Sequence, residues 1–364
     1  MGVLLPISKL MIVDPGSSQM GVVRRILCCG IGVVLCYTGA SEDSPWLDEL
    51  VEVRHSGSKG FSVGDIDCIL EFIDTEEKRI EFLRSEAVIN SGVPVLSRGT
   101  TLSFRDVLCS KVGSSVLSRI VNVNLPSFYQ KALVFECAFH AENSADCRNL
   151  LKKLLNEKVK LIAYEGYEYG FYDKIGYFFA TACIVGAYVS EVDVEVADYI
   201  IACENTGISL GTFATLDRLG IDIFLKALEC RVEDDEMLRS MYKRLPLVIY
   251  DMVSDGVVGL GSRGGFYRTY DMLYGKVSQV IDIASGLYRL EKRDMYLHEC
   301  LLDNDRCEKF IQFVWQSFFS YVKRILELYG ASCLSVIDAV LCTGYGWKYG
   351  VREIASRTGI DFQM

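Results

Sequence analysis

Residues that commonly carry chemistry are sparse in this chain. Its 364 residues include three histidines and 14 cysteines, and no two cysteines have the C-x-x-C spacing of a zinc ribbon or a redox pair. This usage indicates buried free thiols in a reducing cytosol, so we expect a cytoplasmic protein without a metal site. The acidic run at residues 233–236 could attract a cation. A helix start explains it better, because carboxylates there face the positive end of the helix dipole.

One glycine-containing turn has the sequence context of a phosphate-binding loop. Residues 10–13 are an apolar, strand-like run, and a turn-forming stretch, residues 14–18, follows it. A helical segment, residues 20–29, and a second apolar run, residues 33–37, come next. Strand, turn, helix and strand form the opening of a βαβ unit, in which the N-terminus of the helix can hold a phosphate.

Strand-like and helix-like segments continue to alternate as far as about residue 165. This alternation predicts a doubly wound α/β domain over residues 1–165. The further strands that we expect are residues 67–73, 93–96, 119–123 and 159–164, and the further helices are residues 75–89 and 146–158.

The rest of the chain has helical periodicity and contains an internal repeat. Asp198 and Asp338 lie 140 residues apart, each within an apolar run. A G-x-x-x-G turn follows each of them, at residues 207–211 and 346–350, with an offset of 139. The pattern predicts one helical unit used twice, with a single-residue insertion or deletion between the copies.

Glycine and charge divide this helical part. Five glycines within residues 256–265 end a run of helices, and a charged connection begins at residue 286. We therefore expect a first copy over residues 166–285 and a second over residues 286–364. The helices expected in the first copy are residues 174–189, 192–202, 212–230 and 235–254.

Charge and hydropathy exclude two classes of partner. The net charge is −10, which disfavours nucleic acid, because a phosphate backbone attracts basic surfaces. The longest apolar run, residues 26–37, is shorter than the roughly 20 residues that cross a bilayer. We expect neither nucleic-acid binding nor membrane insertion.

Three segments of the helical part resemble one enzyme family. Residues 207–222 resemble the G-Y-P-M-G-P-F-E-L-L-D-x-V-G-L-D segment of the NAD-dependent 3-hydroxyacyl-CoA dehydrogenases, and residues 256–267 resemble their G-x-L-G-x-K-T-G-x-G-F-Y signature. Residues 345–350 resemble the G-x-G-W-x-x-G segment of the duplicated helical half in long members. Residues 82–100 and 119–136 can be laid on the family's T-N-T-S and H-F-F-N-P segments. The chain is identified as a long-form member that ends too soon for a crotonase-type domain.

The resemblance implies a fold, a reaction and partners. The fold is a Rossmann-like α/β domain followed by an all-α domain with a tandem helical repeat. The reaction oxidises 3-hydroxyacyl-CoA to 3-ketoacyl-CoA with NAD in fatty-acid β-oxidation, and a histidine base held by a glutamate removes the hydroxyl proton. The partner implied is an acyl-CoA. A duplicated helical domain can supply the contacts that short members make by dimerising, so we expect a monomer.

The family's catalytic positions are mostly replaced here. The resemblance places them at Thr100, Asn124, Glu136 and Lys174, where the family has serine, histidine, glutamate and asparagine. Only Glu136 keeps the family's residue, twelve positions after Asn124. An amide does not titrate and cannot accept the proton as imidazole does. Tyr129, Glu136 and Lys174 are the candidates for a substitute base.

The cofactor positions are also altered. The family's glycine-rich turn falls on Asp14, Pro15, Gly16 and Gly21, and its ribose-binding acid falls near Tyr37. An aspartate where the pyrophosphate approaches is repulsive, and a proline removes a backbone donor. We therefore expect weak or absent NAD binding and a dehydrogenase whose activity is reduced or lost. The alternative is a non-catalytic acyl-CoA-binding or protein-assembly pseudoenzyme.

Overall fold

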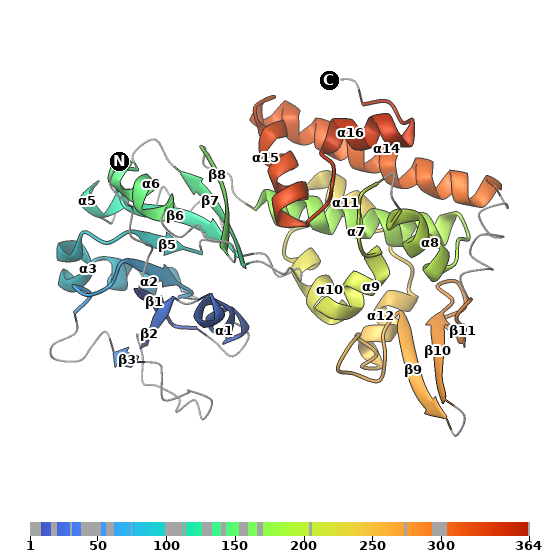
Figure 1. Ribbon diagram of the computed structural model, residues 1–364, viewed down its shortest axis with the longest axis horizontal. Helices are drawn as coiled ribbons and strands as arrows, with labels where there is room; N and C mark the ends of the chain where they lie inside the picture. Colours follow the sequence, from blue (N-terminus) through green and yellow to red (C-terminus); the bar gives the residue numbers. More distant parts are fainter. Residues whose placement is uncertain are drawn as a thin grey trace. The chain divides into compact units, whose positions relative to one another are not determined.

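The computed structural model divides the chain into two compact units (Figure 1). The first consists of residues 1–126 and 131–170, and the second of residues 127–130 and 171–364. The residues that the structure describes are 9–15, 20–29, 31–37, 52–55, 62–73, 75–98, 112, 114–125, 133–139, 143–152, 159–165, 170–203, 206–272, 275–292 and 304–362.

The first unit is built on an eight-stranded sheet. Its strand order is β3-β2-β1-β4-β5-β6-β7-β8, and neighbouring strands are parallel except for the antiparallel pair β6 and β7. The strands are β1 (Lys9–Val13), β2 (Gly32–Tyr37), β3 (Glu52–His55), β4 (Cys68–Glu71), β5 (Val95–Ser97), β6 (Ile120–Asn124), β7 (Leu133–Phe139) and β8 (Val159–Glu165). The helices are α1 (Met20–Cys28), α2 (Glu76–Leu83), α3 (Glu86–Ser91), α5 (Ser114–Leu117) and α6 (Ala145–Lys152).

Helices cover both faces of this sheet, as the alternating pattern predicted. Side chains alternate along a strand, so Leu10 and Ile12 of β1 belong to a different buried cluster from Met11 and Val13. The first cluster also contains residues of α1 and α6, and the second contains residues of α2, α3 and α5. The doubly wound architecture is therefore confirmed.

Local details of the first unit differ from expectation. The segment expected as one helix over residues 75–89 forms α2 and α3, because Ser85 adopts an extended conformation with ψ of 141°. Strands β3 and β7 were not predicted. Residues 153–158, which we expected to be helical, lie outside the described residues.

The second unit is mainly helical and is centred on α7, which is buried on nearly all sides. None of the helices in the described part of the chain is long and apolar enough to span a membrane. The helices are α7 (Phe171–Val189), α8 (Val194–Ile201), α9 (Thr212–Leu219), α10 (Ile221–Glu229), α11 (Glu236–Tyr242), α12 (Val248–Ser254), α14 (Asn304–Tyr329), α15 (Cys333–Ala339), the π-helical turn η2 (Val340–Gly344) and α16 (Val351–Thr358).

Two expected helices of this unit are each interrupted. The segment 212–230 breaks at Gly220, whose φ of 101° is incompatible with a helix, to give α9 and α10. The segment 235–254 breaks before Pro246, which has no N–H with which to continue α11. Helical periodicity continued through both breaks, which is why the sequence did not separate the helices.

The predicted repeat is present in the backbone. Gly207 and Gly346 are equivalent by sequence, and both lie in the left-handed region, with φ of 68° and 70°. Gly211 and Gly350 are the N-cap residues of α9 and α16. The N–H of Lys348 donates to the carbonyl of Gly207 at 2.9 Å, so the equivalent turns of the two copies contact each other.

The repeated aspartates perform the same task in both copies. The carboxylate of Asp198 accepts the N–H groups of Phe213 at 2.8 Å and Ala214 at 2.9 Å, at the start of α9. The carboxylate of Asp338 accepts the N–H of Val351 at 2.8 Å, at the start of α16. Each aspartate therefore satisfies backbone donors that a helix N-terminus leaves free.

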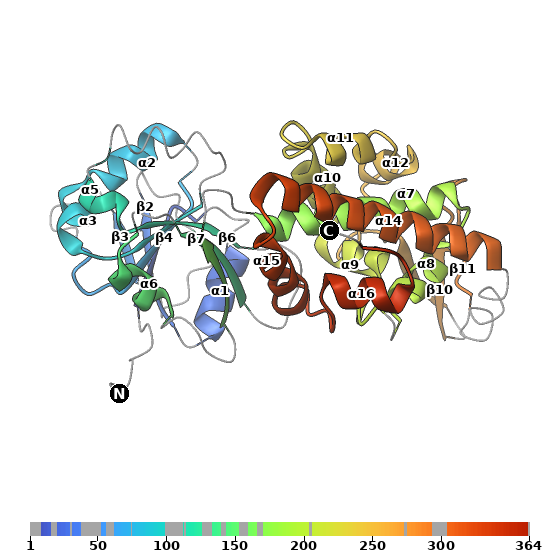
Figure 2. The same cartoon turned by 90° about the horizontal axis from the view of Figure 1, so that it is seen from above.

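The two copies pack through equivalent helices, α7 and α14, which lie side by side (Figures 1 and 2). Phe178 stacks on Tyr321 with ring centroids 3.9 Å apart. Phe179 meets Phe318 edge to face at 5.4 Å. The phenylalanines at 178–179 and 318–319 are equivalent by the same offset of 140, so the repeat forms one shared aromatic core.

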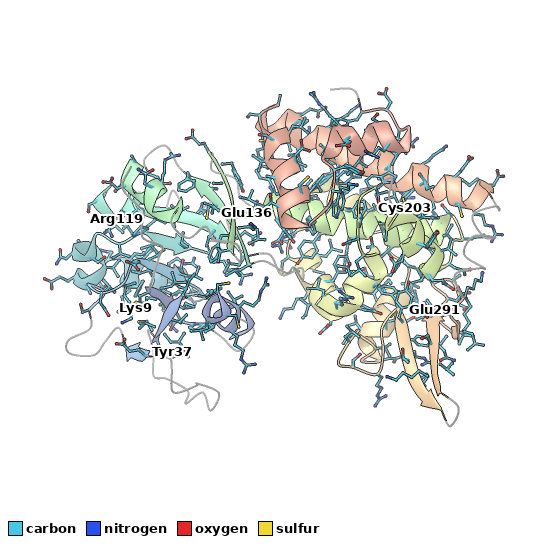
Figure 3. The ribbon with its side chains drawn as sticks, in the orientation of Figure 1. Lys9, Tyr37, Arg119, Glu136, Cys203 and Glu291 are labelled. Atoms are coloured by element: carbon cyan, nitrogen blue, oxygen red, sulfur yellow. The ribbon has the colours of Figure 1, made fainter. Side chains whose placement is uncertain are left out.

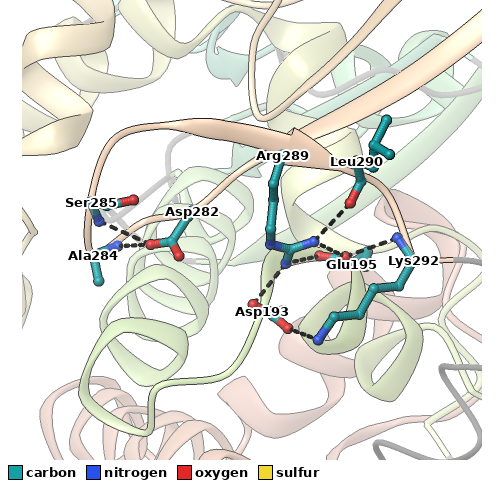
Figure 4. A network of polar contacts seen from close by, with 8 residues as sticks. All are labelled: Asp193, Glu195, Asp282, Ala284, Ser285, Arg289, Leu290 and Lys292. Carbon is teal, nitrogen blue, oxygen red and sulfur yellow. Dashed lines mark hydrogen bonds and ion pairs between the residues drawn. The ribbon is translucent and has the colours of Figure 1, made fainter.

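A three-stranded antiparallel sheet, which the sequence did not predict, also belongs to the second unit. It consists of β9 (Tyr267–Met272), β10 (Gly275–Ile281) and β11 (Tyr288–Leu290), in the order β11-β10-β9. Figure 4 shows the polar contacts that attach this sheet to the start of α8. Arg289 forms a bidentate pair with the buried Glu195 at 2.6 and 2.9 Å, and Asp193 binds both Arg289 and Lys292.

Glycine at position 211 should be essential for the capping contact. In Gly211→Ala the added Cβ would lie 2.1 Å from Cγ of Asp198, so we expect a loss of about 1–3 kcal/mol in the free energy of unfolding. Gly350→Ala meets the Oδ1 atom of Asp338 at 2.6 Å and should be destabilised less. Urea denaturation measures both variants. Gly64→Ala, with 3.5 Å to its nearest neighbour, is the control, and equal stability of all three variants would contradict the prediction.

Asp198 and Asp217, two buried aspartates of the first copy, should make stability depend on pH. Burial raises the pKa of Asp198 from 3.8 to about 7 and the pKa of Asp217 to about 6. The folded chain then keeps protons that the unfolded chain has released, so the free energy of unfolding should fall as the pH rises from about 4 to about 7. Urea denaturation at pH 5 and pH 7 tests this. Asp198→Asn should flatten the profile, whereas the exposed control Asp222→Asn should leave it unchanged.

Candidate functional site

The acid and the amide at the implied catalytic positions lie side by side in the first unit. Asn124 is the last residue of β6 and is paired in register with Glu136 of the antiparallel strand β7. The Nδ2 atom of Asn124 donates to Oε2 of Glu136 at 3.0 Å. Glu136 has no exposed surface and Asn124 is 5% exposed, so this hydrogen bond is shielded from water.

A third side chain, which the sequence analysis did not assign to the site, completes this arrangement. The hydroxyl of Tyr164, on the parallel neighbour β8, donates to Oε1 of Glu136 at 2.9 Å. Burial, followed by the charge of Glu136, raises the pKa of Tyr164 well above its usual value, so the phenol keeps its proton.

The orientation of the amide decides what the arrangement can do. An ionised carboxylate only accepts hydrogen bonds, so Asn124 must turn its Nδ2 atom to Glu136 and its Oδ1 atom away. Oδ1 can accept a hydrogen bond from a ligand hydroxyl, but it cannot take the proton. The site can therefore orient an alcohol without acting as a general base at Asn124.

Of the remaining implied catalytic residues, the structure describes Lys174. Thr100 and Tyr129 lie outside the described residues. Lys174 belongs to α7 of the second unit, where its Nζ atom lies 3.2 Å from the hydroxyl of Tyr329. The same ammonium lies 5.0 Å from the Tyr329 ring and 6.0 Å from the ring of Phe171, so its described contacts are largely aromatic.

The residues at the implied cofactor positions do not fit a dinucleotide well. Asp14 follows β1 with a φ of 47°, the left-handed conformation in which this turn normally has glycine, and its N–H donates to the carbonyl of Cys36 at 2.8 Å. Tyr37 ends β2, and burial together with the nearby charge of Asp14 raises its pKa, so the phenol is neutral. Gly21 is the second residue of α1, and Gly16 lies outside the described residues. A carboxylate thus occupies the strand end where the family's pyrophosphate approaches.

These groups occupy different parts of the same sheet. Tyr37 lies on the side formed by β2, and Glu136 on the side formed by β6, β7 and β8 (Figure 3). Asp14, Tyr37 and Asn124 follow or end parallel strands, at the carboxyl edge of the sheet. Ligands of open α/β sheets bind at this edge.

A buried ion pair at the same edge was missed by the sequence analysis. Glu71 ends β4 and has no exposed surface, and its Oε1 atom lies 2.8 Å from Nε of Arg79. The hydroxyl of Ser97, at the end of β5, donates to the same carboxylate, as does the N–H of Ile73. Burial raises the pKa of Glu71, and the Arg79 charge and these hydrogen bonds oppose the shift. The one sequence signal was an acidic residue at the end of an apolar strand.

Comparison with known proteins identifies the fold. No family model matches the chain. Over 160 residues it is 26% identical to a Rickettsia felis protein described as a fatty acid oxidation complex trifunctional enzyme. That match covers 42% of this chain and only 22% of the relative, so the chain spans far less than two thirds of it.

Solved structures are similar over more of the chain. The 3-hydroxybutyryl-CoA dehydrogenase of Escherichia coli K12 has a TM-score of 0.60 at 11% identity, covering 97% of this chain and 92% of its own. FadB2 of M. tuberculosis has a TM-score of 0.50 at 13% identity, covering 73% of this chain and 99% of its own. The resemblance deduced from the sequence is therefore confirmed at the level of the fold, a Rossmann-like α/β unit followed by a mainly helical unit with a tandem repeat.

The ion pair of Glu71 should be required for the stability of the first unit. Arg79→Met leaves a buried carboxylate without its cation, so we expect a loss of about 3–5 kcal/mol in the free energy of unfolding. The double variant Glu71→Gln/Arg79→Met should recover most of the loss. Arg148→Met, which breaks an exposed pair, should cost about 1 kcal/mol or less. Chemical denaturation compares the three, and a single Arg79→Met variant as stable as Arg148→Met would contradict the prediction.

Proposed function

We propose that the chain is a 3-hydroxyacyl-CoA dehydrogenase homologue that binds an acyl-CoA and oxidises 3-hydroxyacyl-CoA slowly or not at all. The observation that carries the proposal is the buried hydrogen bond between Asn124 and Glu136. It keeps the pairing of base position and orienting acid that the sequence resemblance implies, with an amide in place of the imidazole. The fold shared with a 3-hydroxybutyryl-CoA dehydrogenase supports the same ligand class.

The chemistry of the cluster sets the expected rate. A 3-hydroxyl group at Asn124 can donate to Oδ1, which orients the alcohol. General-base catalysis contributes about 10²- to 10⁴-fold, and this contribution is lost when the proton acceptor is an amide. The Oε2 and Oε1 atoms of Glu136 each accept a hydrogen bond, from Asn124 and Tyr164, so the carboxylate is already engaged within the protein and is poorly placed to act as a substitute base.

One observation favours the alternative, a non-catalytic acyl-CoA-binding or assembly protein. The carboxylate of Asp14 stands at the strand end where NAD would place its negative pyrophosphate. Repulsion at this point weakens cofactor binding whatever the state of the base. The two functions therefore differ first in whether the chain binds NAD, and only then in its rate.

Restoring the imidazole should separate these functions. We expect Asn124→His to raise the rate of NADH-dependent reduction of acetoacetyl-CoA by about 10²- to 10⁴-fold over the unmodified chain. The loss of NADH absorbance measures the rate. Asn124→His/Glu136→Gln is the matched control and should lose most of the gain, because the imidazole is no longer held by an acid.

A parallel titration of NADH, followed by nicotinamide fluorescence, tests the cofactor. The unmodified chain should bind weakly, and Asp14→Gly should bind about tenfold or more tightly, because it removes a like charge. Low-micromolar binding by the unmodified chain would contradict weak cofactor binding. Asn124→His that stays inactive, combined with no NADH binding by Asp14→Gly, would establish the non-catalytic alternative.

A further inference from the structure

The second unit contains a partly open and mainly apolar cavity between the two copies of the repeat. Its volume is about 50 Å³. One wall is α7, a second is the turn and start of α9 in the first copy, and a third is the turn of the second copy. These walls include Gly176 and Ala180 of α7, Leu210 and Leu216 of the first copy, and Tyr345 and Trp347 of the second.

The hydroxyl groups around the cavity already have partners. The Thr215 hydroxyl donates to the carbonyl of Gly211 at 2.8 Å, and the Tyr345 hydroxyl donates to the carbonyl of Tyr172 at 2.8 Å. The Thr212 hydroxyl lies 3.3 Å from a buried cysteine thiol. These hydroxyls are engaged as donors within the protein, and most of the other lining side chains are apolar, so the cavity favours an apolar occupant.

The cavity is not a by-product of the repeat. The residues equivalent to Gly176 and Ala180, 140 positions later, are Gln316 and Ser320. Both are exposed on α14, whereas Gly176 and Ala180 are buried on α7. Only the first copy therefore combines small residues on its long helix with a covering turn, and the space exists because those side chains are small.

We propose that this cavity binds the end of an unbranched alkyl chain. Its volume exceeds the roughly 10–15 Å³ that one water needs and is well below the ~150 Å³ that takes a benzene ring, so it holds about two or three carbon atoms. The proposal that an alkyl end binds here is based only on the residues that line the cavity. Identifying that end with the acyl group of an acyl-CoA rests on the proposed function.

A series of straight-chain 1-alkanols, from methanol to hexanol, tests the cavity without any CoA. Isothermal titration calorimetry should show the dissociation constant falling by about fourfold for each methylene that enters, and levelling once the cavity is full. Trp347 borders the cavity, so its fluorescence should change with occupancy. A dissociation constant that does not depend on chain length would overturn the proposal.

Substitutions in the wall of the cavity test whether the alkanols bind there. Ala180→Val fills the cavity and should weaken the best alkanol by about tenfold or more, while Ser320→Val, its equivalent on the exposed face of α14, should change nothing. Leu210→Ala enlarges the cavity and should move the optimum to a longer chain, so the proposal stays testable if Ala180→Val does not fold. Equal alkanol binding by Ala180→Val and Ser320→Val, or an unmoved optimum in Leu210→Ala, would overturn it.

The same titration with butyryl-, hexanoyl- and octanoyl-CoA separates this inference from the proposed function. If the alkyl end is the acyl group, the acyl-CoA series should show the same dependence on chain length and the same sensitivity to Ala180→Val. Alkanols that bind where acyl-CoAs do not would leave the cavity as an alkyl site and remove the acyl-CoA from the proposed function.

Discussion

A buried carboxylate that accepts backbone N–H groups is the contact on which the second unit depends. Asp198 joins α8 to the start of α9, and Asp217 within α9 accepts the N–H groups of Phe266 and Tyr267 at 2.7 and 2.8 Å. The Tyr267 hydroxyl donates to the Oδ2 atom of Asp198 at 3.0 Å, so the two aspartates belong to one hydrogen-bonded network. Burying a carboxylate is unfavourable, and the hydrogen bonds from backbone N–H groups offset only part of this cost, so the pKa values of both aspartates stay raised. These hydrogen bonds therefore link α8, the start of α9 and the start of β9 to one another.

How much of the fold could be predicted depends on how far apart in the sequence the interacting residues lie. The spacing of Asp198 and Gly211 is local, and it recurs with little change at Asp338 and Gly350, so the sequence alone revealed the repeat. Breaks such as Gly220 were hidden by continuous helical periodicity. The sheet of β9, β10 and β11 is formed by consecutive strands and was missed because this stretch was assigned to the helical copies and a charged connection. The contact that attaches it to α8, Arg289 with Glu195, joins residues 94 apart, which no local pattern records.

Separation in the sequence also explains which residues of the candidate site could be predicted. Asn124 and Glu136 are twelve residues apart on adjacent antiparallel strands, so the two positions to which the resemblance pointed lie beside each other in the sheet. Tyr164 reaches Glu136 from 28 residues away, and Ser97 reaches Glu71 from 26. Both contacts require the order of strands in the sheet, which the sequence gives no direct way to know. A site assembled from several strands of a sheet can therefore be predicted only in part from the sequence.

The contact between Asn124 and Glu136 can be explained by stability alone. Glu136 is wholly buried, and a buried charged acceptor that loses a donor costs about 1–3 kcal/mol or more. An apolar residue at position 124 would incur that cost, whereas Asn124 keeps an N–H directed at Oε2. The requirement to satisfy the carboxylate is independent of the requirement for a base. The geometry of the pair therefore does not report on catalysis, and only the ability of a side chain to accept a proton bears on it.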